Sequence, residues 1–196
     1  MTERKLRKLL VNAVPIETER LVIRKINIDD AYDMYEYSSL DDVCEFLLWS
    51  PHVNIAVTEG YIEFLQKRYL RGLYADWAIV LKENRKMIGT CGYAAVDTTN
   101  SICEIGYVLS PKYQKQGYMT EAVNALLELT FSVLNFEIAS LRIINENESS
   151  KRLAERLGFN IDCVKYNELE IKGKYRDIAH YRLNREEYMT KKEAVE

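Results

Sequence analysis

One short segment, residues 104–122 (EIGYVLSPKYQKQGYMTEA), constrains the fold more than any other part of this chain. A strand pattern ends near Leu109, a Ser-Pro pair turns the chain, and Gly117 stands at the start of the next helix. Free backbone N–H groups at a helix start and the positive end of the helix dipole form an anion site, and glycine lets a phosphate approach closely. Lys112 and Lys115 add positive charge there. The segment therefore suggests a phosphate-binding loop, although on spacing alone a plain loop with solvated lysines is the commoner explanation.

The helix after Gly117 has the strongest amphipathic pattern in the chain, with inner-face residues at i, i+3, i+4 and i+7. These residues are Met119, Ala122, Val123, Leu126, Leu127, Thr130, Phe131 and Leu134. Strand patterns occur at 20–26, 76–82, 87–96, 102–109, 138–144, 159–170 and 175–183, and further helix patterns at 27–37, 58–70 and 148–157. A parallel sheet would alternate strand and helix more strictly, so the order predicts one α+β domain with mixed strand directions and an extended tail at each end.

Composition excludes several classes of protein. The chain has 196 residues, 47% of them hydrophobic, which suits one globular domain. A general nucleic-acid binder would carry a basic excess to displace counterions, whereas the formal net charge here is −3. No apolar run approaches the ~20 residues of a membrane span, and no signal-peptide pattern is present. A cytoplasmic location without nucleic-acid or membrane partners is therefore expected.

Cysteine and histidine spacings argue against a metal site. Four cysteines occur without a CxxC pair or metal-ligand spacing: Cys44, Cys91, Cys103 and Cys163. Cys91 and Cys103 could meet across a hairpin, although reduced thiols are expected in the cytoplasm. His52 and His180 have no partner at ligand spacing, so no metal is expected and both are taken as structural.

Residues 114–119 resemble the diphosphate loop of the GNAT superfamily, the acyl-CoA-dependent N-acyltransferases, which has the form Q/R-x-x-G-x-G/A. Gln114 and Gly117 match, Met119 departs at the last position, and Lys115 stands where a glycine is often found. Residues 145–159 (NENESSKRLAERLGF) are similar to the family's helix N-x-x-S-x-x-V/L-x-E-K/R-x-G-F. The matching positions are Asn147, Ser150, Leu153, Glu155, Arg156, Gly158 and Phe159.

Other segments resemble one branch of that family, which contains the bacterial ribosomal-protein N-terminal alanine and serine acetyltransferases. They are ETERLVIRKINIDDA (17–31), the EIGY strand, the GYMTEA helix entry and GKYRDIAHYRL (173–183). The resemblance covers residues 15–185 as a single GNAT domain, with an N-terminal arm at 1–14 and a C-terminal tail at 186–196. It implies a mostly antiparallel sheet of about seven strands flanked by about four helices and splayed at the fourth and fifth strands.

The resemblance also implies acetyl-CoA as co-substrate. Its diphosphate is expected on Gln114, Lys115, Gln116, Gly117, Tyr118, Met119 and Thr120. Its pantetheine arm is expected on the backbone of Tyr107, Val108 and Leu109, with Asn147 and Ser150 at the thiol end. A bulge at Gly106 would open the strand beside it, and a backbone N–H near Val108 could polarise the thioester oxygen. Lys151 and Arg152 could reach the 3′-phosphate, although solvated helix charges are commoner.

Glu104 and Ser150 are the candidate catalytic residues. Glu104 matches a strand glutamate that several family members use as general base, and a partly apolar cleft would raise its pKa. A surface or cross-strand charge is an equal alternative for Glu104, and Glu168 and Glu170 in a late strand rank second as the base. Ser150 resembles the residue that hydrogen-bonds or protonates the CoA sulfur, whereas its alternative role is a local helix cap, which Asn147 could also supply.

The acceptor is the least constrained feature. An α-amino group with a pKa of about 7.7–8.0 is partly neutral at pH 7 and needs only a modest base, which favours a protein N-terminus over a lysine side chain. The resemblance to the branch implies a ribosomal protein as the acceptor. A small-molecule amine or antibiotic and a non-catalytic acyl-CoA-binding module remain as alternatives. Trp49, Trp77 and Tyr107 would line the acceptor side unless they belong to the core. The late hairpin and the 1–14 arm could pair two copies, although no feature demands a homodimer.

Overall fold

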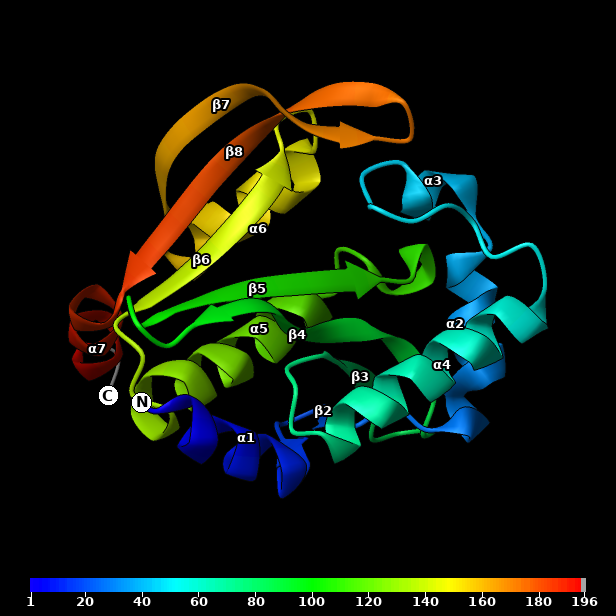
Figure 1. Ribbon diagram of the computed structural model, residues 1–196, viewed down its shortest axis with the longest axis horizontal. Coiled ribbons are helices and arrows are strands. Elements are labelled where there is room, and N and C mark those ends of the chain that lie inside the picture. Colours follow the sequence, from blue (N-terminus) through cyan, green and yellow to red (C-terminus); the bar gives the residue numbers. More distant parts are fainter. Residues whose placement is uncertain (195–196) are drawn as a thin grey trace.

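Eight strands form one sheet in the order β1-β2-β3-β4-β5-β6-β8-β7 in the computed structural model, which describes residues 1–194 (Figure 1). The strands are β1 (Ile16–Glu17), β2 (Leu21–Arg24), β3 (Asp76–Leu81), β4 (Met87–Asp97), β5 (Ile102–Leu109), β6 (Ile138–Ile144), β7 (Asn160–Ile171) and β8 (Lys174–Asn184). The α-helices are α1 (Glu3–Val11), α2 (Ala31–Ser38), α3 (Asp41–Cys44), α4 (Ile55–Leu70), α5 (Tyr118–Glu128), α6 (Glu148–Leu157) and α7 (Arg185–Glu193). Neighbouring strands are antiparallel except β5 and β6, so the predicted α+β class is confirmed, with more helices than expected.

Local sequence explains where many of these elements begin and end. Asn27 and Asp30 form the expected capping box before α2. The Asn54 side chain caps α4 by accepting a hydrogen bond from the Val57 N–H. Gly158 ends α6 with a left-handed φ of +93°, which glycine adopts without steric cost. Strands β5 and β6 coincide with their predicted ranges, whereas the short helix α3 was not predicted.

The sheet divides where β5 meets β6. These parallel strands pair only from Ile102 opposite Ile138 to Glu104 opposite Ser140. Beyond Glu104, β5 keeps its pairing with β4 as far as Leu109, while β6 stays paired with β8. The sheet therefore separates into two halves beyond Glu104, as the predicted splay between these strands requires.

The irregularity beside this fork lies in β4 and corrects the prediction of a bulge at Gly106. Gly106 pairs regularly with Gly92, and the register shifts between Tyr93 and Ala95 instead. A Cβ atom added to Gly106 would meet the Ala94 Cβ at 3.6 Å, an ordinary contact. Ala94 is the extra residue in β4, and such a bulge bends the strand that contains it. The bend beside the cleft therefore does not depend on a glycine in β5.

Both terminal segments contain helices, which corrects the expectation that they are extended. Helix α1 lies within the predicted arm at 1–14, and its Leu6 and Leu10 are buried in the main hydrophobic core. Helix α7 begins one residue before the predicted tail at 186–196 and covers most of it, and residues 195–196 fall outside the described part of the chain. Where the domain begins and ends remains a prediction.

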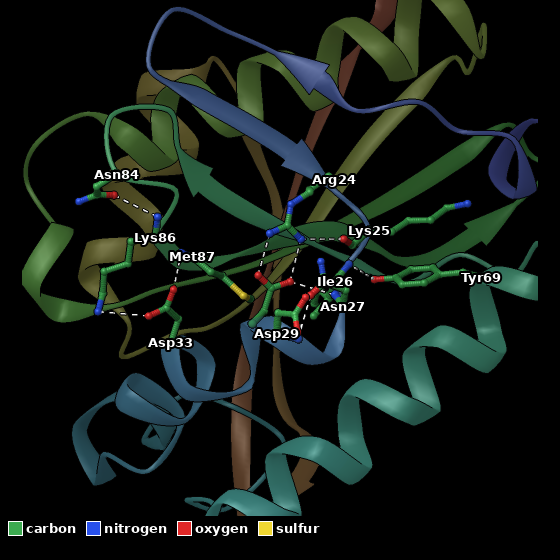
Figure 2. A network of polar contacts seen from close by, with 11 residues as sticks. Arg24, Lys25, Ile26, Asn27, Asp29, Asp33, Tyr69, Asn84, Lys86 and Met87 are labelled. Carbon is green, nitrogen blue, oxygen red and sulfur yellow. Dashed lines mark hydrogen bonds and ion pairs between the residues drawn. The ribbon is translucent and has the colours of Figure 1, made fainter.

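An ion pair between a buried carboxylate and a partly buried guanidinium attaches the start of α2 to the sheet (Figure 2). Arg24 donates from both terminal nitrogens to the two Asp30 carboxylate oxygens at 2.7 Å, and the Asn27 N–H donates to Asp30 at 2.9 Å. On the next turn, Asp33 accepts a hydrogen bond from the Met87 N–H at 2.9 Å. These contacts join α2 to β2 and β4 and complete one face of the domain.

The four cysteines are unpaired, and Cys91 and Cys103 do not lie opposite each other, because they pair with Tyr107 and Val96. Burial raises the pKa of the Cys91 and Cys103 thiols, so both stay protonated. Within residues 1–194, no group of three or more potential metal ligands occurs, and no helix is long and apolar enough to cross a membrane.

Candidate active site

A cleft of about 860 Å³ occupies the fork between β5 and β6. Its walls come from β5, the loop and first turn of α5, β6, α6, the segment 42–48 and the β7–β8 hairpin. Figure 1 shows α3 facing the tip of the β7–β8 hairpin across the opening. The cleft therefore joins the two sequence segments that carry the family motifs to an unpredicted helix.

The loop before α5 lines this cleft at Gln114, Lys115 and Gly117. Lys115 and Gly117 both have left-handed backbone conformations, with φ of 61° and 83°. Alternation of such conformations forms a concave backbone site for anions at a helix start. Lys115 adopts the conformation that usually favours glycine, which explains why a glycine is often found at this position of the motif.

Most residues predicted for the diphosphate loop line the cleft: Gln114, Lys115, Gly117, Tyr118, Met119 and Thr120. Gln116 is not among the described lining residues. Its side chain donates to the Lys112 carbonyl at 3.0 Å, and its own carbonyl accepts a hydrogen bond from Arg20 at 3.0 Å. Gln116 therefore supports the loop and does not form its surface.

Arg20 and Glu121 support this loop through hydrogen bonds. Neither residue was predicted from the sequence to have this role. The Arg20 N–H and Nε donate to the Glu121 carboxylate at 2.8 and 2.7 Å, and the Thr18 hydroxyl also donates to it. The Arg20 guanidinium lies 4.4 Å from the centre of the Tyr118 ring. Burial alone would raise the pKa of Glu121, but these hydrogen bonds bring it below its ordinary value. The segments 17–31 and 104–122, noted separately in the sequence, thus meet in one cluster.

Glu104 lies at the fork, where it is the last β5 residue paired with β6. Its side chain is 18% exposed and lines the cleft. Arg142 Nε on β6 donates to Glu104 Oε1 at 2.9 Å, and this contact leaves Oε2 available to accept a proton. In addition to the partly apolar cleft that was expected, Glu104 therefore has a charged partner on one side.

The second-rank carboxylates lie elsewhere. Glu168 accepts a hydrogen bond from His180 at 2.6 Å and lies 3.6 Å from the Lys165 ammonium group. Burial acts to raise the pKa of Glu168, but His180, Lys165 and Arg142 together lower it. Neither Glu168 nor Glu170 is among the described residues that line the cleft. Geometry thus favours Glu104 as the carboxylate that can reach a bound amine.

Ser150 of α6 and Tyr107 of β5 form a hydroxyl pair that joins these two walls of the cleft. Their oxygens are 2.8 Å apart, and both residues line the cleft. Burial raises the pKa of Tyr107 to about 12, so its hydroxyl stays protonated in the working range. Asn147 caps α6 by accepting from the Ser150 N–H at 3.1 Å, so the Ser150 hydroxyl is free of the capping role. Sequence analysis had placed only the backbone of Tyr107 on the cofactor path.

The remaining candidates are divided between the core and the surface. Trp77 is buried in the main core, and Trp49 packs 5.1 Å from His52 and is not among the described lining residues. Lys151 forms an ion pair with Glu148 at 2.5 Å, whereas Arg152 lines the cleft. The prediction that both tryptophans line the acceptor side is therefore wrong, and the alternative of a core position holds for Trp77.

Comparison with known proteins fits this geometry. A family model described as acetyltransferase (GNAT) domain matches residues 20–160, well over half of the chain. The chain belongs to the GNAT acetyltransferases. The expected enzyme class, an N-acetyltransferase of the family that uses acetyl-CoA as co-substrate, is thereby confirmed.

Relatives of this GNAT protein differ in the acceptors their names give. It is 29% identical to an uncharacterised N-acetyltransferase p20 of Bacillus licheniformis, over 87% of this chain and 96% of the relative. It is 24% identical to the ribosomal protein uS5-alanine N-acetyltransferase of Escherichia coli, over 85% and 89%. It is also 24% identical to a spermidine N(1)-acetyltransferase of Vibrio cholerae, over 69% and 81%.

Solved structures support the fold. The microcin C7 self-immunity acetyltransferase MccE, solved with acetyl-CoA and AMP, matches with a TM-score of 0.78 and 20% identity. The match covers 85% of this chain and 93% of that protein. At this identity the likeness establishes the GNAT architecture and leaves the acceptor open.

Proposed function

We propose that this GNAT enzyme transfers the acetyl group of acetyl-CoA to the α-amino group of a protein N-terminus. The charge of the cleft is the observation that carries this proposal. Its described lining has two carboxylates, Asp42 and Glu104, and Glu104 is paired with Arg142. The other charged lining residues are Lys115, Arg142, Arg152 and Arg156. A polyamine with several positive charges would find few partners here, whereas a single amine needs only one carboxylate.

The structure offers acetyl-CoA two backbone surfaces. The loop with Lys115 and Gly117 suits the diphosphate, because consecutive N–H groups there meet the positive end of the α5 dipole. The stretch of β5 from Tyr107 to Leu109 pairs with β4 but not with β6, so its free edge can pair with the amides of the pantetheine arm. Asn147, Ser150 and Arg152 lie on the α6 side of the same cleft.

The reaction forms a C–N bond to the amine nitrogen and breaks the C–S bond of the thioester. In our proposal Glu104 Oε2 takes the proton that the amine loses, and Arg142 keeps the carboxylate oriented through Oε1. Ser150 donates its hydroxyl proton to the departing sulfur, and Tyr107 replaces that proton along their shared hydrogen bond. Solvent then returns a proton to Tyr107 and takes the one held by Glu104, which restores the starting state. A neutral α-amino group of pKa about 7.7–8.0 needs little help from the base, which suits a carboxylate paired with arginine.

Ser150→Ala is expected to lower kcat about tenfold with little change in the KM for acetyl-CoA, because it removes the proton donor to sulfur. Tyr107→Phe should cost less. The double variant should be no slower than Ser150→Ala alone, since the two hydroxyls act as one unit. Steady-state thiol release measures these values, with Tyr166→Phe, an exposed residue outside the cleft lining, as the control. Additive losses, or undiminished turnover in Ser150→Ala, would remove the pair from the mechanism.

Arg20→Met is expected to lower kcat/KM for acetyl-CoA about 10- to 100-fold, because hydrogen bonds from a charged group hold the diphosphate loop. Turnover of acetyl-pantetheine, which lacks the diphosphate, should stay nearly unchanged. The matched control is Lys82→Met, which removes the exposed 3.0 Å ion pair with Glu17. Equal losses with both donors would show that Arg20 supports the fold as a whole and not the loop.

A thiol-release assay on N-terminal peptides and spermidine tests the proposed acceptor. Faster acetylation of a free peptide N-terminus than of spermidine is the expected result. Faster acetylation of spermidine would contradict the proposal and would show that this protein acetylates a small-molecule amine.

A further inference from the structure

A second, small apolar cluster lies apart from the main core, on one wall of the cleft. It consists of Ile144, Ile171 and Ile178, with Phe46 and Leu169 packed against them. All five residues also line the cleft, so they border open space as well as each other. We call the part of the cleft that they border the apolar chamber.

The apolar chamber has a fixed wall on the side of α3. Val43, Leu47 and Leu48 of this segment line the same cleft. The Lys172 ammonium group, in the turn between β7 and β8, donates to the carbonyl of Cys44 at the C-terminal end of α3. A cation at a helix C-terminus is favourable, so this bond ties the α3 segment to the hairpin across the opening. Phe46, two residues beyond Cys44, is thereby held in place.

The apolar chamber is continuous with the proposed reaction centre but lies beyond it along β6. Glu104 pairs with Ser140, whereas Ile144 is at the far end of the same strand. The pantetheine arm is expected on the β5 edge opposite, from Tyr107 to Leu109. An acceptor whose amine reaches Glu104 would therefore direct its neighbouring groups into the apolar chamber.

Resting on the proposed function, we infer that the acceptor's N-terminal residue carries a large apolar side chain, such as leucine or methionine, which the apolar chamber binds. Leucine buries more apolar surface than alanine or serine, and this surface would meet Phe46, Leu169 and Ile171. The five side chains that define the apolar chamber carry only hydrocarbon, so they offer a serine hydroxyl or a second ammonium group no polar partner. Among protein N-termini, the preference for the first residue is thus set by apolar contact.

The test compares peptides that differ only in the first residue, with acetyl-CoA as donor. Leucine and methionine peptides are expected to exceed the serine peptide in kcat/KM by about 10- to 100-fold. This is the range of discrimination that a hydrophobic pocket achieves when substrates differ by one or a few methylene groups. Phe46→Ala should reduce this ratio several-fold, and Leu169→Ala should do the same if Phe46→Ala is unstable in a thermal melt. Phe64→Ala is the matched control, since Phe64 is half-exposed on α4 and not among the described lining residues.

Three results would overturn the inference. One is a serine or alanine peptide used as well as leucine, and another is a Phe46→Ala variant that slows all peptides equally. The third is a Phe46-dependent preference for butyryl-CoA over acetyl-CoA, which would assign the apolar chamber to the acyl group. In all three, peptides are still acetylated, whereas failure of the proposed function itself would appear as no acetylation of any peptide.

Discussion

Glu104→Gln is expected to lower kcat about 10²- to 10⁴-fold, the contribution of a positioned general base. Glutamine keeps the shape of the side chain and an oxygen that can accept from Arg142 Nε, so the fork should retain its structure. The amide cannot take a proton from the amine. Steady-state thiol release should therefore show the loss in kcat, while the dissociation constant of acetyl-CoA changes little.

Glu168→Gln and Glu170→Gln are the matched controls for this prediction. Glu168 is held by His180 and Lys165, and neither carboxylate is among the described cleft residues. Both variants should keep kcat within a few-fold of the parent. A larger loss in Glu168→Gln or Glu170→Gln than in Glu104→Gln would move the base to the late strand.

Asp30→Ala is expected to lower the free energy of unfolding by about 3 kcal/mol, the lower end for breaking a buried ion pair. The Asp30 carboxylate is 6% exposed and accepts hydrogen bonds from Arg24 and from the Asn27 N–H. Its removal leaves the partly buried guanidinium and the start of α2 without these acceptors. Urea denaturation followed by circular dichroism measures the change.

The neighbouring Asp29→Ala provides the control, because Asp29 is exposed and accepts no hydrogen bond from Arg24. Its effect should stay below about 1 kcal/mol, as for most surface substitutions. A loss in Asp30→Ala no greater than that in Asp29→Ala would mean that the ion pair shown in Figure 2 contributes no net stability.

Elements with strong local signals could be predicted from the sequence. The apolar spacing after Met119, the Asn27–Asp30 capping box and Gly158 as a helix stop each depend on residues within a few positions of one another. The loop before α5 was identified through its resemblance to the family motif, because spacing alone did not distinguish it from a plain loop; Gly117 adopts the left-handed conformation that suits a glycine there. The α+β class follows from these elements and their order.

Contacts between distant segments could not be predicted in the same way. Arg20 and Glu121 are 101 positions apart, and Tyr107 and Ser150 are 43 apart. The Glu104–Arg142 pair depends on the register of the only parallel strand pair in residues 1–194. Helix α3 has four residues, too few for a periodic pattern, although its segment forms one wall of the cleft.

Acetyl-CoA-dependent thiol release with three acceptors tests the central claim most directly. They are a leucine peptide with a free N-terminus and an internal lysine, the same peptide with its N-terminus blocked, and spermidine. The account predicts rapid release with the free peptide, at least about tenfold slower release with spermidine, and almost none with the blocked peptide, because a lysine amine of pKa about 10.4 is rarely neutral. Equal rates for free and blocked peptides, faster release with spermidine, or binding of acetyl-CoA without release by any amine would contradict it.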